Sequence, residues 1–186
     1  MKKLKKYVVL LLVVYIGVWL TLSATQAGVL TLQVAAQQNS NLLTRVFVTL
    51  GANPEDLGQD GLSALHFAAY LGAEQVIPPL IEKGAPVDMQ DKDGRAALHM
   101  AAYAGQVSAV AALLEHGANP EIVENKGGMT ALHLAVTQNH IPVIKVLLEK
   151  GANANPKEKN GYTPLFIAQN ENLKEIAELL KQHGAH

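Results

Sequence analysis

The chain has 186 residues, of which 49% are apolar and 5% aromatic, and its net charge at pH 7 is −1. This length allows one domain or at most two small ones, and the lack of cysteine excludes both a disulfide framework and a cysteine metal site. The near-neutral charge disfavours a dedicated nucleic-acid binder, which usually has a clear basic excess. Abundant Ala and Leu with few rings favour closely packed helices.

Residues 1–27 have the composition of an export leader. A basic start with four lysines precedes an apolar run from Tyr7 to Leu20, and mostly small residues follow up to Ala27. This order is typical of a signal peptide that is cleaved after Ala27. The apolar run is short for a membrane span, which needs about 20 residues. The apolar run becomes longer when Leu22 is included, so an uncleaved membrane anchor over residues 7–22 remains an alternative to the cleaved signal peptide.

Both interpretations of the leader predict the same topology. The lysines keep the N-terminus in the cytoplasm, since the next basic residue is Arg45, and the rest of the chain crosses the membrane. Because the leader holds four lysines and no acid, residues 28–186 carry a net charge of −5. This acidic balance further disfavours nucleic acid or an anionic membrane surface as a partner. Membrane contact is then expected only through residues 7–22, if the leader is uncleaved.

The rest of the chain repeats with a period of 33 residues. Four series of residues recur in one register over five units, and each series has one spacing of 34, because one residue is inserted between Gly117 and Gly128. Such self-similarity is typical of a solenoid of stacked units. The series are Gly51, Gly84, Gly117, Gly151 and Gly184, each followed by Ala; Gly28, Gly61, Gly94, Gly128 and Gly161; Leu32, Leu65, Leu98, Leu132 and Leu165; and Ala35, Ala68, Ala101, Ala135 and Ala168.

Each unit predicts a short helix, a tight turn, a second helix and a long turn. Residues 98–102 begin a first helix that has small side chains on one face. Residues 110–115 belong to a second helix that ends at the glycine of the first series. The turn between the helices carries Gly or Asn, the residue types that tolerate the left-handed φ of a helix C-cap. These turn residues are Asn39, Gly72, Gly105, Asn139 and Asn172.

The repeated segments resemble the ankyrin repeat. Residues 61–72 read Gly-Leu-Ser-Ala-Leu-His-Phe-Ala-Ala-Tyr-Leu-Gly, residues 94–105 and 128–139 follow the same pattern, and residues 163–165 keep its Thr-Pro-Leu. The resemblance covers residues 28–186. It implies an all-α solenoid of helix-turn-helix units with β-turn or hairpin fingers. The units are 28–57, 58–90, 91–124, 125–157 and 158–186.

Departures from the pattern predict local features. Gln33 replaces the usual His in the first unit, and Gln169 and Lys181 replace apolar residues in the last unit, as expected for soluble ends of a solenoid. Pro79 should kink or delay the second helix of its unit, with Pro78 close enough to the helix start to be tolerated. Pro142 fits a first helical turn.

The histidines are the main candidates for chemistry. His66, His99 and His133 share one repeat position, but stacked helices lie about 8–10 Å apart, too far for shared metal ligation at about 2.1 Å. The resemblance implies that each bonds to turn backbone instead. His116 and His183 suit the carbonyls of helix C-termini.

No other residues indicate a catalytic or metal site. Ser63 suits a helix start, and Asp88, Asp91 and Asp93 fit a solvated turn better than a calcium loop. The sequence has no G-x-S-x-G, H-E-x-x-H, phosphate-loop or G-x-G-x-x-G motif. We therefore expect no catalytic residues, no metal and no cofactor.

The resemblance implies that a partner protein binds the finger tips and the ends of the first helices, which line a concave surface. Tyr70 and Tyr103 occupy equivalent positions in adjacent units, so they should lie side by side, and Tyr is enriched in binding hot spots. That the tyrosines merely cover the helix surface stays open. Phe47, Phe67 and Phe166 are expected to help pack the stack. The expected binding residues are Leu62, Tyr70, Leu71, Lys92, Asp93, Arg95, Tyr103, Lys126, Met129, Gln138 and Tyr162.

These observations favour an exported, non-enzymatic scaffold for protein–protein interaction. A leader on a short cysteine-free array resembles bacterial periplasmic ankyrin-repeat proteins and suggests an adaptor, immunity or stress-accessory role. The expected location is periplasmic or secreted, or the inner membrane with the C-terminal domain facing the periplasm if the leader is an anchor. A secreted effector acting on a host protein remains an alternative. An enzyme with a site hidden in the repeats is disfavoured, because no acid, base and nucleophile converge.

Overall fold

The computed structural model describes residues 34–36, 53–55, 57–58 and 61–186. The predicted leader, residues Gln33, Asn39 and Phe47, and most of the first unit lie outside these residues. The helices are α4 (Ala64–Leu71), α5 (Ile77–Glu82), α6 (Ala97–Tyr103), α7 (Val107–Glu115), α8 (Ala131–Thr137), α9 (Ile141–Glu149), α10 (Pro164–Asn170) and α11 (Lys174–Gln182). None of the helices in the described ranges is long and apolar enough to cross a membrane.

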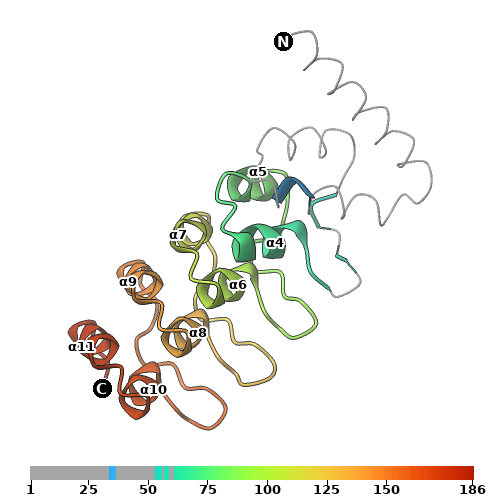
Figure 1. Ribbon diagram of the computed structural model, residues 1–186. Helices are drawn as coiled ribbons and strands as arrows, with labels where there is room; N and C mark the ends of the chain where they lie inside the picture. Colours follow the sequence, from blue (N-terminus) through green and yellow to red (C-terminus); the bar gives the residue numbers. More distant parts are fainter. Residues whose placement is uncertain (1–33, 37–52, 56, 59–60) are drawn as a thin grey trace, which may run out of the picture.

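The helices form two rows in an elongated stack (Figure 1). Helices α4, α6, α8 and α10 pack on one another in chain order, and each is followed by the second helix of its unit. Long loops, which we call fingers, project from the side of the first row away from the second. The predicted all-α solenoid of helix-turn-helix units is therefore confirmed for the described part of the chain.

Small side chains allow the first row to pack closely. Ala68, Ala101, Ala135 and Ala168 have no exposed surface. A methyl group at this position lets neighbouring helix backbones approach while the interior keeps its usual packing density. The recurring leucines lie beside them in the same core, so two of the four repeat series form the contact surface between units.

The turns between helices have the predicted left-handed backbone. Asn139 and Asn172 both have φ of 57°, and they are the only described residues other than glycine with positive φ. Gly72 and Gly105 occupy the same place with φ of 70° and 72°. The exchange of Gly for Asn in this position follows from the conformation, because Asn is the side chain that best tolerates it.

Helix α5 is shorter than its counterparts, as the two prolines predict. It has 6 residues, whereas α7, α9 and α11 each have 9. Residues 74–76 form a turn in place of the first helical turn, and Pro78 and Pro79 then lie where the backbone N–H groups have no intrahelical acceptor. Pro142 lies in the first turn of α9, also as predicted.

Each finger is a short hairpin closed by a backbone hydrogen bond. The N–H of Asp91 donates to the carbonyl of Arg95 at 2.9 Å, and Glu158 bonds in the same way to Tyr162 at 3.1 Å. In the finger between them the corresponding bond joins Glu124 to Met129 at 3.0 Å, so this finger holds one more residue. The predicted insertion between Gly117 and Gly128 therefore lies at a finger tip.

The last unit has the polar surface predicted for an end of the stack. Gln169 and Lys181 are exposed, whereas Leu148, which corresponds to Lys181 in the preceding unit, is buried. Polar side chains at exposed positions of this kind suit the end unit of a solenoid, where apolar side chains would face water.

Candidate functional site

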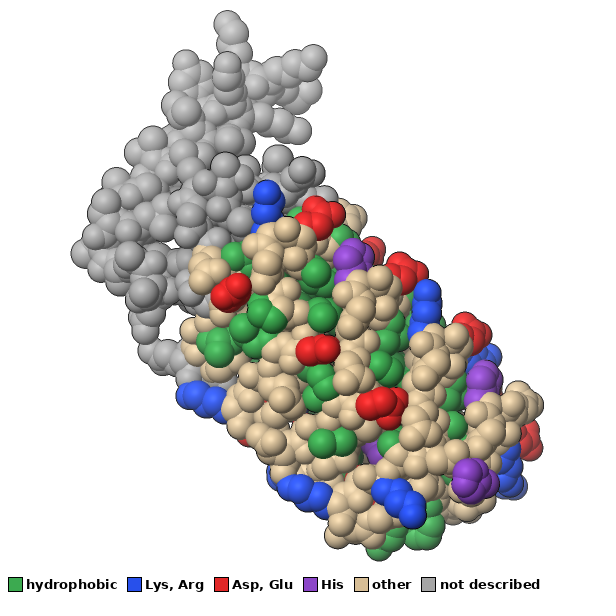
Figure 2. Space-filling model, turned by 180° about the vertical axis from the view of Figure 1, so that it is seen from behind, with side chains coloured by type: hydrophobic (Ala, Val, Ile, Leu, Met, Phe, Trp, Pro, Cys, Tyr) green, Lys and Arg blue, Asp and Glu red, His purple; other side chains and the backbone are tan. Residues whose placement is uncertain are grey.

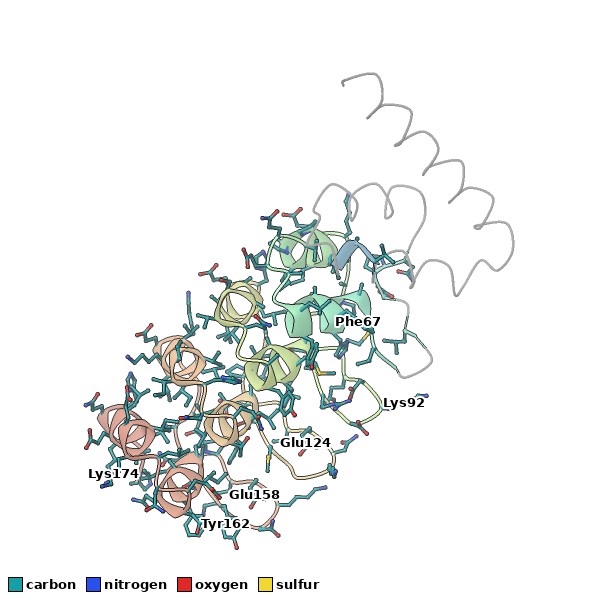
Figure 3. All side chains as sticks on the ribbon, in the orientation of Figure 1. Phe67, Lys92, Glu124, Glu158, Tyr162 and Lys174 are labelled. Carbon is teal, nitrogen blue, oxygen red and sulfur yellow. The ribbon has the colours of Figure 1, made fainter. Side chains whose placement is uncertain are left out.

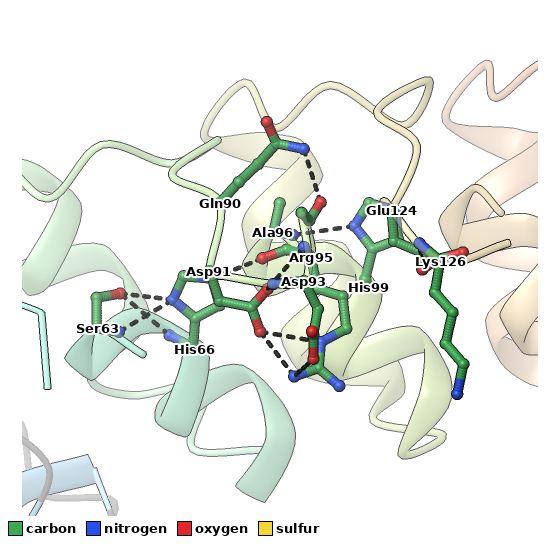
Figure 4. Close-up of polar contacts among 11 residues, drawn as sticks. Ser63, His66, Gln90, Asp91, Asp93, Arg95, Ala96, His99, Glu124 and Lys126 are labelled. Carbon is green, nitrogen blue, oxygen red and sulfur yellow. Dashed lines mark hydrogen bonds and ion pairs between the residues drawn. The ribbon is translucent and has the colours of Figure 1, made fainter. Parts of the chain in front are cut away.

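The recurring histidines connect each first helix to the next finger. The Nδ1 atom of His66 accepts a hydrogen bond from the N–H of Ser63 at 3.1 Å, so the ring proton is on Nε2. Nε2 in turn donates to the carbonyl of Arg95 at 2.9 Å (Figure 4). Ser63 also caps α4, which confirms its predicted role at a helix start.

His99 and His133 repeat this arrangement in the next units. Their Nε2 atoms donate to the carbonyls of Met129 at 3.2 Å and Tyr162 at 3.1 Å. Burial lowers the pKa of all three imidazoles below the ordinary value, although the backbone carbonyls act in the opposite direction. The histidines are thus neutral donors that hold the fingers, as the family resemblance implies.

Buried carboxylates shape the finger tips. Asp91 accepts hydrogen bonds from the N–H groups of Asp93 and Arg95, and its other oxygen binds the Arg95 guanidinium at 2.8 Å. Glu124 accepts from three backbone N–H groups of its own finger. Burial raises the pKa of Asp91 and Glu124, but these hydrogen bonds outweigh it and hold both below the ordinary value. The carboxylates are therefore structural and ionised.

A hollow of about 690 Å³ lies between the fingers and helices α4, α6 and α8. We call the surface formed by the fingers and α4, α6, α8 and α10 the concave face. Tyr70 and Tyr103 both line the hollow and are each 48% exposed, so these equivalent residues share one site as predicted. Six of the predicted binding residues line it: Leu62, Tyr70, Arg95, Tyr103, Lys126 and Met129.

The floor of the hollow includes residues that the sequence analysis did not assign to binding. Phe67, Met100 and Leu134 line it, and Phe67 and Met100 also pack against the core with part of their surface. Figure 3 shows Phe67 on the finger side of α4. All three directly follow the repeated histidine, so a large apolar residue at that position was the available signal. The expectation that Phe67 packs the stack is correct but incomplete.

A family model for ankyrin repeats in three copies matches residues 32–124 and again residues 120–186. The chain belongs to the ankyrin-repeat family. Ankyrin repeats are generally modules for protein–protein interaction, and the family is one of non-enzymatic scaffolds. We found no curated protein that matches the chain.

The other predicted binding residues of this ankyrin-repeat protein lie outside the hollow. Lys92 and Asp93 are exposed at a finger tip, where Asp93 forms an ion pair with Arg95 at 2.9 Å. Leu71 is exposed as the last residue of α4, and Gln138 is exposed as the C-cap residue of α8. These positions border the same face, but the structure does not bring them into the hollow with the tyrosines.

Tyr162 lies in the last finger and stacks on Phe166, with ring centroids 4.5 Å apart. The expectation that Phe166 packs the stack is wrong, because its side chain is 46% exposed. Phe166 occupies the position of the repeated histidine. At this position the aromatic ring stacks on Tyr162 of its own unit, whereas each histidine bonds to the carbonyl of the next finger.

The remaining histidines of the ankyrin array also serve local structure. His116 and His183 donate from Nδ1 to the carbonyls of Ala112 at 2.7 Å and Leu179 at 2.9 Å, as predicted for helix C-termini. His140 donates to the carbonyl of Tyr103 in the preceding unit. Across the described residues, no cluster of three or more His, Asp or Glu is arranged to hold a metal ion.

The charge pattern does not suggest a nucleic-acid surface. The face in Figure 2 carries both acidic and basic side chains, and residues 28–186 together have a net charge of −5. A nucleic-acid binder usually has a clear overall excess of basic residues. Together with the apolar hollow, this pattern favours a protein partner.

Proposed function

We propose that residues 28–186 form a non-enzymatic scaffold that binds a partner protein on the concave face. The observation that carries this proposal is the hollow of about 690 Å³, which collects six of the residues expected to bind. Half-exposed Tyr70 and Tyr103 offer large apolar area at low entropic cost, and such side chains dominate interface energetics. The histidines and carboxylates nearby are occupied by bonds within the fingers, which supports binding rather than catalysis.

Replacement of both tyrosines tests the proposal. Tyr70→Ala together with Tyr103→Ala should abolish capture of the partner, because the apolar contact area of the hollow is lost. The helical circular dichroism should stay unchanged, since both side chains are half exposed. Capture would be measured by affinity purification from periplasmic extract with mass spectrometry.

Lys145→Ala is the matched control, because Lys145 is exposed on α9 in the second row of helices. The control should capture the same protein as the natural chain. If the double tyrosine variant captures as much partner as the control, the concave face is not the binding surface.

We further propose that the array acts outside the cytoplasm of a bacterium, as an adaptor, immunity or stress-accessory protein in the periplasm. The basic, apolar and small-residue order of residues 1–27 supports export. The exported protein should begin at Gly28 when its N-terminus is sequenced. An intact Met1 in the membrane fraction would instead support an inner-membrane anchor, and recovery from the medium would support a secreted effector.

A further inference from the structure

Three successive fingers present an exposed lysine at the tip. They are Lys92, Lys126 and Lys159, and Figure 3 shows Lys92 extending from its finger. Within these fingers Asp91, Glu124 and Glu158 are less than 9% exposed, whereas Asp93, next to Lys92, is exposed and forms an ion pair with Arg95. A molecule approaching the fingers therefore meets exposed lysine side chains, of which Lys159 also donates to the carbonyls of Asn125 and Lys126. The three buried carboxylates accept hydrogen bonds from backbone N–H groups inside each finger.

The lysine in the middle of this row stands at the hollow itself. Lys126 lines it together with Arg95 and Glu124. The Arg95 guanidinium is already bound by Asp91 and Asp93, and the Glu124 carboxylate is bound by backbone N–H groups. Of the charges lining the hollow, Lys126 thus offers the ammonium that a ligand can pair with, beside an apolar floor.

We propose that the partner inserts an extended acidic peptide segment, with one bulky apolar side chain in the hollow and carboxylates on the finger lysines. This inference rests on the proposed function and specifies the partner's chemistry. Charge complementarity carries it, because the fingers expose lysines although residues 28–186 have a net charge of −5. Nucleic acid would also offer negative charge, but it would leave the apolar floor of Phe67 and Met100 unused.

The repeat spacing predicts the spacing of the acids. Neighbouring packed helices lie about 8–10 Å apart, and the fingers follow the same repeat. An extended chain in the polyproline II conformation advances about 3.1 Å per residue and places every third side chain on one face, so a peptide lying across the fingers reaches the next lysine after about three residues. The segment should therefore carry acidic residues about three positions apart, with an aromatic residue or leucine between them.

Selection from a displayed library of random peptides tests this directly. The bait would be the purified protein from Gly28 onward with its whole array, and the binding buffer would have low salt. Enriched peptides should combine acidic residues at about three-residue spacing with an aromatic residue or leucine. Their binding should weaken as salt rises, since exposed charges are screened.

Charge reversal supplies matched variants. Lys126→Glu should weaken binding of a selected acidic peptide by about tenfold, because attraction becomes repulsion at the hollow. Lys145→Glu makes the same charge change on α9, outside the concave face, and should leave affinity within about twofold. A copy of the peptide with its acids replaced by lysine should prefer Lys126→Glu over the natural chain.

The outcomes separate this inference from the proposed function. Peptides that are basic, or uncharged and purely apolar, but that lose binding in the Tyr70→Ala, Tyr103→Ala variant would overturn the acidic segment and leave the concave face as the binding surface. Peptides insensitive to the tyrosines and to Lys126→Glu would contradict both. Failure to enrich any peptide would also overturn the inference, because the site would not accept an extended segment.

Discussion

Gly128 and Gly161 occupy the same place in two neighbouring fingers but have different surroundings. Both have left-handed backbone, with φ of 71° and 84°. A Cβ at Gly128 would lie 3.0 Å from Lys159 Cγ and 3.2 Å from the Lys159 backbone nitrogen, whereas a Cβ at Gly161 would meet nothing within 4 Å. The recurring glycine is therefore needed for backbone conformation in every described finger and for finger stacking only where another finger follows.

This difference predicts unequal effects of the same substitution. Gly161→Ala should lower the free energy of unfolding by about 1–2 kcal/mol, the cost of left-handed backbone. Gly128→Ala should cost about 1 kcal/mol more, because the Lys159 nitrogen is held by its bond to Gly127 and cannot easily move. Urea denaturation of both variants measures the difference. Equal losses would mean that the next finger shifts without penalty.

Helix α6 provides the corresponding test at the scale of an element. Its residue Ala101 has no exposed surface, and the helix packs between α4 and α8. Ala101→Leu should lower the free energy of unfolding by about 1–3 kcal/mol, because the added carbons would force the helices apart. Ala111→Leu on the partly exposed side of α7 is the control and should be close to neutral. A neutral Ala101→Leu in thermal or urea unfolding would contradict the packing described here.

The helices and turns also show which structural features could be predicted from the sequence. The Gly and Asn turns and the late start of α5 could be predicted, because each depends on the conformational limits of one residue and its immediate neighbours. The position of Phe166 could not, because its exposure depends on whether a following finger exists to contact the histidine position. The local sequence pattern predicted a core position for Phe166, whereas in the structure its ring stacks on Tyr162.

At the scale of the whole molecule, the repeat predicts which residues share a face but not the shape of that face. Tyr70 and Tyr103 were placed together by register alone. The hollow also needs Phe67, Met100 and Leu134. Phe67 and Met100 pack against the core as well as lining the hollow, and a hydrophobic residue at a helix position gives no sign of this division. The division between core and surface depends on how much of each side chain the neighbouring finger covers, which is set by contacts between units.

The histidines that join those units make the stability of the whole array depend on pH. His66, His99 and His133 each link one unit to the next finger, and burial lowers the pKa of each in the folded chain. In the unfolded chain they titrate near 6.5. Below that pH the unfolded state binds protons that the folded state resists, so the free energy of unfolding falls as pH decreases.

We expect the urea midpoint to fall between pH 7.5 and pH 5.5, with each fully protected histidine contributing up to about 1.4 kcal/mol per pH unit below about pH 6.5. Asp91 and Glu124 have lowered pKa values too, but their contribution is lost only below about pH 4.5, where the unfolded carboxylates protonate. His99→Gln should therefore flatten the dependence in the upper range, because it removes one buried imidazole. A midpoint independent of pH over this range would show that the buried imidazoles accept protons without disturbing the fingers.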